Sequence, residues 1–223
     1  MTTMILVLGL AYLVGAVPWS WLFARRAGLD LRRVGSGNLG ATNAYRALGA
    51  RGALPVLLLD IAKGAAPPFL VARFRFDSPL VGSEMLAALA GLAAIVGHIF
   101  PVYLRFRGGK GIATAAGAFL VIEPLACVLS ILVFVVALVA TRGIVSVGSL
   151  ASAAALPVAL FGVTAWRGES RIATVIVAGV VAVLVWCKHT TNLRRLHAGS
   201  EKRIFDRRAS AAGVTTGSGG RSR

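Results

Sequence analysis

Acidic residues, cysteines and histidines are all scarce in this 223-residue chain. It holds 8 Asp and Glu against 24 Lys and Arg, and charged residues make up only 14% of the total. A soluble domain of this length would have far more charge, so the composition excludes that class. Both cysteines, Cys127 and Cys187, lie in apolar runs, where we expect buried thiols rather than a disulfide or a metal pair. Because no group of His, Cys and carboxylate residues has metal-ligand spacing, the sequence predicts no metal site.

Apolar residues, by contrast, dominate the chain. They make up 57% of it, and the mean hydropathy is +0.80. The apolar runs are about 15–25 residues long, which is enough to cross a hydrocarbon layer of ~30 Å. They predict an all-α integral membrane protein with about seven transmembrane helices. We divide the long run 111–141 at Glu123-Pro124, because proline disfavours a continuous helix there. The predicted spans lie near 4–24, 53–72, 84–104, 111–122, 125–141, 144–165 and 172–187.

The basic residues predict one orientation of these spans. With seven spans and an external N-terminus, nineteen of the 24 Lys and Arg fall in segments on the side of the C-terminus, and four fall on the other side. This asymmetry is the positive-inside pattern, so we expect a membrane protein with a cytoplasmic C-terminus. A six-span arrangement would leave the basic C-terminal region outside, and we reject it.

The charge distribution also bears on partners and domains. A net charge of +16 could indicate nucleic acid binding, but basic loops beside apolar spans are better explained by anionic membrane lipids. We therefore predict no nucleic acid partner. Residues 1–205 form one predicted polytopic membrane domain. Residues 206–223 are rich in Ala, Gly, Ser and Arg, which predicts a disordered basic cytoplasmic tail.

Three polar, glycine-rich or basic stretches interrupt the apolar chain. They are Gly35–Gly49, Gly97–Gly117 and Lys188–Ile204, and the predicted orientation places all three on the cytoplasmic side. Charged side chains and flexible backbone are costly near lipid, so their accumulation on one side indicates a functional site. Arg, Lys, Ser, Asn and backbone N–H groups suit a phosphate-bearing ligand.

The first stretch begins with a match to the dinucleotide fingerprint G-x-G-x-x-G. No strand precedes it, so we reject that interpretation. The pattern instead predicts a flexible loop and a short helix, Ala41–Leu48, that Gly49 ends as a C-cap. Thr42 and Arg46 share one face of this helix. An ordinary loop with a snorkelling arginine explains the stretch equally well when it is taken alone.

The second stretch contains Gly108-Gly109-Lys110-Gly111 just before an apolar run. It is not a Walker loop, because Leu104 stands where the first glycine belongs and Gly111 replaces the Ser or Thr. Glycines around one lysine still predict a backbone cradle with a mobile cation. A positive-inside loop is the alternative, but it does not explain the glycines.

The third stretch and the second span add further polar residues. His189 and Asn192 are three residues apart at the end of the last span, so we expect them to share a face, with Arg195 one turn further on. Within the second span, Asp60 and Lys63 are also three residues apart, and pairing is the least costly arrangement for two charges in lipid. We expect that pair to support the site.

Together these stretches resemble the bacterial membrane acyl-phosphate:glycerol-3-phosphate acyltransferase family. Its S-G-N-x-G-A-T-N-x-x-R signature matches Ser36–Arg46, and its G-H-x-x-P…F-x-G-G-K-G-x-A-T signature matches Gly97–Thr114. The H-x-x-N-[IL]-x-R-L…G-x-E signature matches His189–Glu201, and D-x-x-K-G matches Asp60–Gly64. The resemblance covers about residues 4–205, and three ordered motifs make it specific.

The resemblance implies transfer of a fatty acyl group from acyl phosphate to the 1-hydroxyl of glycerol 3-phosphate, giving lysophosphatidic acid and phosphate. It implies no acyl-CoA, acyl carrier protein, cofactor or metal. Acyl phosphate is already activated, so we expect catalysis by positioning and charge neutralisation.

The implied roles fall on residues of all three stretches. Arg46 and Lys110 would neutralise phosphate, His189 and Asn192 would orient glycerol 3-phosphate, and Ser36 would donate a hydrogen bond without forming an acyl-enzyme. His189 is also a candidate general base, although a substrate phosphate could accept the proton instead. The further predicted binding residues are Gly37, Asn38, Thr42, Gly108, Gly109, Gly111, Thr114, Arg195 and Glu201.

A transporter of small organic phosphates is the alternative from another class. It would also need cations in the membrane, but it predicts internal repeats and polar groups at mid-depth. The chain has no visible repeat and gathers its motifs at one interface, so we favour the enzyme.

Overall fold

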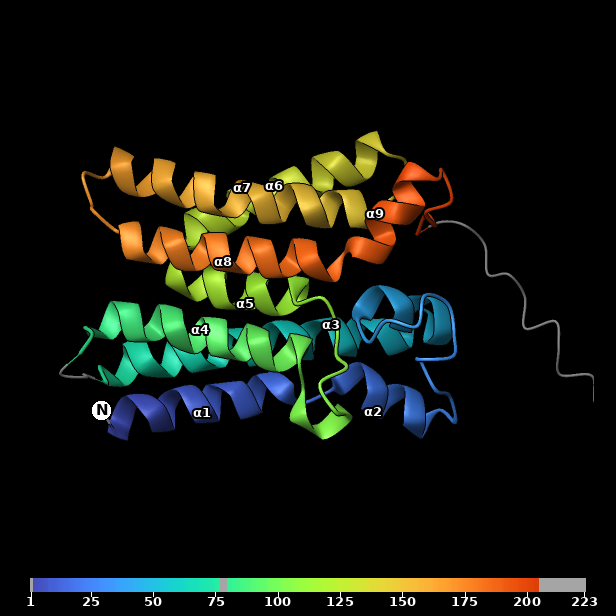
Figure 1. Ribbon diagram of the computed structural model, residues 1–223, viewed down its shortest axis with the longest axis horizontal. Coiled ribbons are helices and arrows are strands. Elements are labelled where there is room, and N and C mark those ends of the chain that lie inside the picture. Colours follow the sequence, from blue (N-terminus) through green and yellow to red (C-terminus); the bar gives the residue numbers. More distant parts are fainter. Residues whose placement is uncertain (1, 77–79, 205–223) are drawn as a thin grey trace, which may run out of the picture.

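The computed structural model describes residues 2–76 and 80–204, and their regular secondary structure is helical. The helices pack lengthwise into one elongated bundle (Figure 1). The elements are α1 (Thr2–Ala16), α2 (Trp19–Arg26), α3 (Ala41–Phe74), α4 (Ser83–Ile99), η1 (Val102–Leu104), α5 (Ile112–Ile122), α6 (Pro124–Ala140), α7 (Val145–Trp166), α8 (Ile172–Lys188) and α9 (Thr190–His197). The all-α prediction is thus confirmed, whereas the proposed tail at 206–223 lies outside the described residues.

Fewer than seven of the described helical segments are long enough to cross a membrane by themselves. Four segments are long and apolar enough to cross a membrane, and α8 with α9 forms a fifth candidate bent by 58°. α5, with 11 residues, has a length of only about 17 Å, and it is separated from α6 at Glu123-Pro124, where the sequence predicted a break. α5 and α6 therefore form a broken pair, and the count of seven stays a prediction.

Two predicted elements differ in detail from the observed ones. The apolar run 4–24 forms two helices, because Pro18 has no N–H and α1 ends at Ala16. Gly49 does break the helix that starts at Ala41, with φ 71°, but a second helical segment continues from it through the rest of α3. The predicted end of the short helix at Gly49 is thus confirmed, and α3 consists of two helical segments that meet at this kink.

Small residues let neighbouring helices approach closely. A Cβ on Gly15 or Gly97 would collide with the backbone of α4 or α1 respectively, and a Cβ on Gly64 or Gly117 would collide with the backbone of α5 or α3. Without a hydrophobic driving force in lipid, such close packing is a main source of helix association. The two contacts fix α4 and α5, which flank the second glycine-rich stretch.

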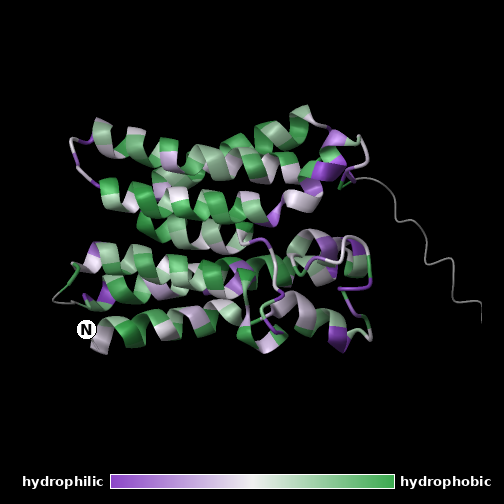
Figure 2. Ribbon diagram, viewed as in Figure 1, coloured by the Kyte–Doolittle hydropathy of each residue, from purple (hydrophilic) through white to green (hydrophobic). Residues whose placement is uncertain are grey.

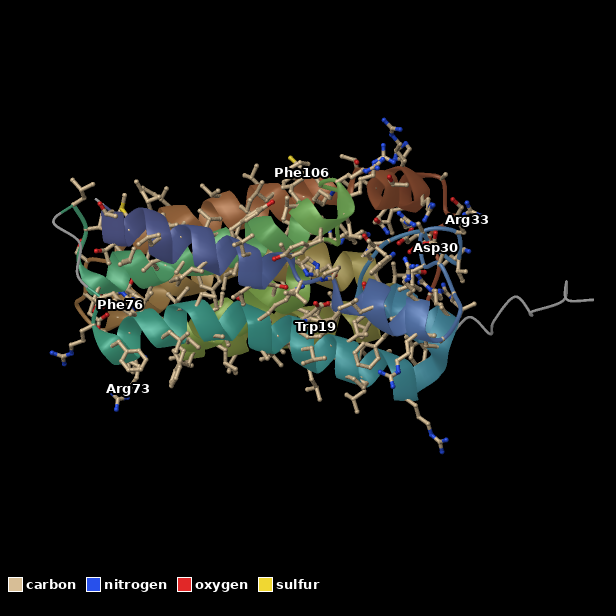
Figure 3. The ribbon with its side chains drawn as sticks, turned by 90° about the horizontal axis from the view of Figure 1, so that it is seen from below. Trp19, Asp30, Arg33, Arg73, Phe76 and Phe106 are labelled. Carbon is tan, nitrogen blue, oxygen red and sulfur yellow. The ribbon has the colours of Figure 1, made fainter. Side chains whose placement is uncertain are left out.

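Polar residues gather at the two ends of the bundle, and most of them at one end (Figure 2). The loop after α2 and helix α9 lie at that end, and the loop between η1 and α5 lies in the same half of the bundle, whereas the N-terminus lies at the opposite end (Figure 1). Asp30 and Arg33 mark the first end, and Arg73 and Phe76 mark the other (Figure 3). The three stretches therefore meet at one end, as predicted. The side of the membrane that this end faces stays a prediction.

The two cysteines differ in their environment. Cys127 is buried, as predicted, but Cys187 is exposed on the surface of the bundle. The prediction of two buried thiols was therefore wrong for Cys187, because the apolar run of α8 has an outward face as well as a packed one.

Candidate active site

The first stretch is organised by Asn43, a buried residue with 1% of its surface exposed. Its side-chain Nδ2 donates to the carbonyls of Leu31 (3.1 Å) and Val34 (3.0 Å), and its Oδ1 accepts from the backbone N–H of Ser36 (2.9 Å). Gly35 has φ 65° and no room for a Cβ beside the Asn43 amide. One amide therefore holds the loop in the shape that presents Ser36. The sequence analysis assigned no role to Asn43, although it lies inside the first signature.

The glycines of the second stretch pack against the end of α4. The N–H of Gly108 donates to Ile99 O (3.2 Å), and the N–H of Gly109 donates to His98 O (3.1 Å). A Cβ on either glycine would collide with atoms of α4 or its following turn, and Gly111 has φ 85° at the start of α5. The expectation of free amides around an anion thus needs correction at Gly108 and Gly109, because those amides satisfy the last carbonyls of α4. The loop holds Lys110 in place and leaves its side chain free to reach the third stretch.

A chain of hydrogen bonds connects Lys110 of the second stretch to the third stretch. Lys110 Nζ donates to Asn192 Oδ1, and Asn192 Nδ2 donates to Glu201 Oε1. Asn192 is buried on α9, with 8% of its surface exposed. His189 lies between α8 and α9, is 1% exposed, and its Nδ1 lies 2.7 Å from Val185 O. The fold therefore brings the second and third stretches into direct contact.

All three stretches line one cavity of about 210 Å³. Of its lining residues, Lys110, Lys188 and Arg195 are cationic and Asn192 supplies an amide. The full lining is Ser36, Gly37, Asn38, Gly108, Lys110, Lys188, Thr191, Asn192 and Arg195. Seven of the predicted site residues are among them, but the sequence analysis assigned no role to Lys188 and Thr191, even though both lie inside the third stretch.

The other predicted residues do not line this cavity. Arg46 is half-buried, and its Nη2 donates to Lys202 O (3.4 Å), so it contacts the segment that follows α9. Glu201 lines a second cavity of about 280 Å³ beside α9. Thr114 is fully buried on α5. The predicted residues that are not part of the cavity lining are Thr42, Arg46, Gly109, Gly111, Thr114, His189 and Glu201.

Burial and neighbouring charge change the basicity of two groups. Burial lowers the pKa of Lys110 to about 8, against an opposing effect of Glu201, and Arg195, Arg46 and Lys188 lower it further. The His189 pKa falls to about 4, first because of burial and then because of the positive charge of Lys110. Lys110 is therefore mostly charged at neutral pH, whereas His189 is neutral.

Metal binding can be assessed only from the described side chains. Within residues 2–76 and 80–204, no group of three His, Cys, Asp or Glu side chains could hold an ion. What the cavity offers is an excess of positive charge next to hydroxyl and amide groups, a combination suited to phosphate oxygens.

Comparison with known proteins decides the family. The family model for glycerol-3-phosphate acyltransferase matches residues 5–199. The chain belongs to the glycerol-3-phosphate acyltransferase family. A relative named glycerol-3-phosphate acyltransferase from Geobacter sulfurreducens is 43% identical over 87% of this chain and 94% of its own length. A second, from Desulfotalea psychrophila, is 42% identical over 86% of this chain and 94% of its own.

Solved structures agree with this assignment. The crystal structure of PlsY, described as an integral membrane glycerol 3-phosphate acyltransferase in its glycerol 3-phosphate form, is similar to this chain with a TM-score of 0.79 and 34% identity. The matched region covers 90% of this chain and 94% of the PlsY chain. The lysophosphatidic acid form of PlsY gives a TM-score of 0.77 and 32% identity. The resemblance found in the sequence motifs is thus confirmed at the level of the acyltransferase family and of the integral membrane fold.

Proposed function

We propose that this chain transfers a fatty acyl group from acyl phosphate to the 1-hydroxyl of glycerol 3-phosphate, the first acylation of phospholipid synthesis. The observation that carries the proposal is the cavity where Lys110, Lys188 and Arg195 converge from two stretches beside Ser36 from the third. Both substrates have a phosphate, and three cations around about 210 Å³ suit phosphate oxygens better than a neutral ligand.

The transfer itself needs little covalent help from the protein. The 1-hydroxyl oxygen attacks the acyl carbonyl carbon, the bond between that carbon and the phosphate oxygen breaks, and phosphate leaves with the electron pair. Lys110 and Arg195 stabilise the negative charge on phosphate, Arg46 contributes positive charge from the edge of the site, and Asn192 orients the glycerol part. Ser36 donates a hydrogen bond and forms no covalent intermediate, because the acyl group is already activated.

The hydroxyl proton has two candidate acceptors, His189 and a substrate phosphate. The ring of His189 directs Nδ1 to Val185 O, and a His189 pKa of about 4 makes the imidazole a weak base at neutral pH. A phosphate monoester, with a second pKa of about 6, is the stronger base. We therefore assign the proton to a substrate phosphate and give His189 the role of orienting glycerol 3-phosphate.

We further propose that the site faces the cytoplasm of a bacterial inner membrane. The support is the convergence of the three stretches at the more polar end of the bundle (Figure 2) and the excess of Lys and Arg in the segments of that end. Membrane lipids then surround the apolar helices, and soluble glycerol 3-phosphate enters from the aqueous side.

The experiment that tests this function compares possible acyl donors. Purified protein in lipid receives glycerol 3-phosphate with acyl phosphate, acyl-CoA or acyl carrier protein in turn, with and without a chelator. We expect lysophosphatidic acid and free phosphate with acyl phosphate alone, unaffected by the chelator. Turnover with acyl-CoA alone would refute the donor assignment. The absence of product with every donor would favour a transporter, for which uptake of glycerol 3-phosphate into proteoliposomes is the measurement.

A further inference from the structure

A cluster of three ionisable side chains lies inside the bundle, beneath the active-site loop. Asp60 and Lys63 of α3 and His98 of α4 are 2%, 6% and 7% exposed. Lys63 Nζ lies 2.8 Å from Asp60 Oδ1, and His98 Nδ1 lies 3.6 Å from the same oxygen. None of the three lines the cavity, so substrate contact does not explain them.

Stability is a weak explanation for such a cluster. The cost of removing two charges from water commonly equals or exceeds their mutual attraction, and apolar replacements are often as stable. Lys63 also donates to Val17 O (2.8 Å), at the break between α1 and α2. The cluster therefore joins three helices at a depth where each charge is costly, which indicates a role in fixing geometry.

His98 connects the cluster to the loop that precedes Lys110. Its backbone carbonyl accepts the N–H of Gly109, and its ring lies so close that a Cβ on Gly109 would collide with Nε2. On its other side, such a Cβ would meet Leu39 O of the first stretch at 2.5 Å. Gly109 is thus held between the His98 ring and the first stretch, one residue before Lys110.

We propose that Asp60 and Lys63 are positioning residues that act through the His98 ring. They fix the position of the Gly108–Lys110 loop relative to α4 and thereby place the Lys110 ammonium within hydrogen-bond distance of Asn192. The route runs from the Lys63–Asp60 ion pair to His98 Nδ1, from His98 Nε2 to Gly109, and along the chain to Lys110. The inference rests on the proposed phosphate-binding role of Lys110, but its main measurement does not need acyl transfer.

The test compares a double variant of the cluster with a control variant in which a buried carboxylate far from the site is neutralised. Asp60→Asn with Lys63→Met removes both charges with little change of volume, which avoids leaving one buried ion unpaired. Glu123→Gln is the matched control, because Glu123 is 3% exposed and accepts from Arg167 (3.0 Å) and Arg171 (3.1 Å) in the loop between α7 and α8. That loop lies at the opposite end of the bundle from α9 (Figure 1).

The first readout is the rate at which an amine reagent labels Lys110 in each full-length protein, measured on its peptide by mass spectrometry. The second is the concentration of inorganic phosphate that halves this rate. In the double variant we expect faster labelling of Lys110 and a rise of about tenfold in the half-protecting phosphate concentration, because a small displacement of a positioned group has effects of that size or larger. The control should keep both values, even if its melting temperature falls.

Three outcomes decide between the proposals. Unchanged labelling and unchanged phosphate protection in the double variant would overturn the positioning role. Equal shifts in the double variant and in Glu123→Gln would reduce the cluster to a stabilising element and overturn it as well. Altered labelling in the double variant, together with a wild-type protein that transfers no acyl group, would keep the positioning role and reject the proposed function.

Discussion

The depressed pKa of Lys110 predicts an unusual pH dependence for substrate binding. An ordinary lysine stays charged up to about pH 10, but burial lowers the Lys110 pKa to about 8. Its positive charge is fully present below that pH and is lost as the pH rises through it. Glycerol 3-phosphate is already a dianion above pH 7, because the second pKa of a phosphate monoester is about 6. Between pH 7 and 9, Lys110 is therefore the group we expect to control affinity.

The magnitude follows from the fraction of charged Lys110. With a pKa of about 8, about nine-tenths of the side chain is charged at pH 7 and about one-tenth at pH 9. If only the charged form binds, the dissociation constant for glycerol 3-phosphate rises about tenfold over this interval, or about 1.4 kcal/mol. Calorimetric titration of the purified protein at several pH values measures this directly.

The control is Lys110→Arg, in which the charge no longer titrates in this range. The planar guanidinium does not reproduce the compact ammonium that reaches Asn192, so we expect weaker binding at every pH. Its dissociation constant should nevertheless stay flat from pH 7 to 9. A wild-type constant that is equally flat, or an arginine variant that keeps the tenfold rise, would show that Lys110 is not the titrating group.

Two further predictions concern Arg46 and orientation. Arg46→Ala should lower acyl transfer by about a hundredfold or more, because it removes a cation from a site that works by electrostatics, while insertion into the membrane stays normal; near-normal turnover would remove Arg46 from the site. Single cysteines at Asn38 and at the exposed Arg107, in a background without Cys127 and Cys187, should resist an impermeant thiol reagent in intact cells and react after permeabilisation. Labelling from outside would reverse the proposed orientation.

The sequence predicted the broad arrangement of the site because that arrangement follows from local rules. Apolar runs of membrane-spanning length define helices, Glu123-Pro124 separates α5 from α6, and polar stretches are confined to the ends of spans. Helices that reverse direction at each loop then bring alternate loops to the same end. The location of the three stretches at one end of the bundle is therefore predictable without any knowledge of packing.

The residues that the sequence analysis missed act through contacts between segments. Asn43 shapes its loop with three hydrogen bonds, two of them to carbonyls 9 and 12 residues earlier in the chain. Lys188 ends an apolar helix, where the positive-inside pattern accounts for it, and only the fold shows that it lines the cavity with its Nζ 5.1 Å from the centre of the Phe100 ring. The amides of Gly108 and Gly109 looked free because their acceptors belong to the end of α4.

The two charged ends of the bundle show how structure separates a binding site from a structural ion pair. At one end, Arg167 and Arg171 both donate to the buried carboxylate of Glu123, and Arg171 also lies 3.6 Å from Glu84. These two arginines therefore have carboxylate partners within the protein.

At the other end, Lys110 is surrounded by the positive charges of Arg195, Arg46 and Lys188, and by the carboxylate of Glu201. The cations of that end repel one another, which is part of the reason for the low pKa of Lys110. Such crowding destabilises the empty site and is relieved when an anion enters. The positive residues that indicate an orientation in the sequence thus lie around one cavity in the fold. A phosphate-bearing substrate neutralises their excess positive charge.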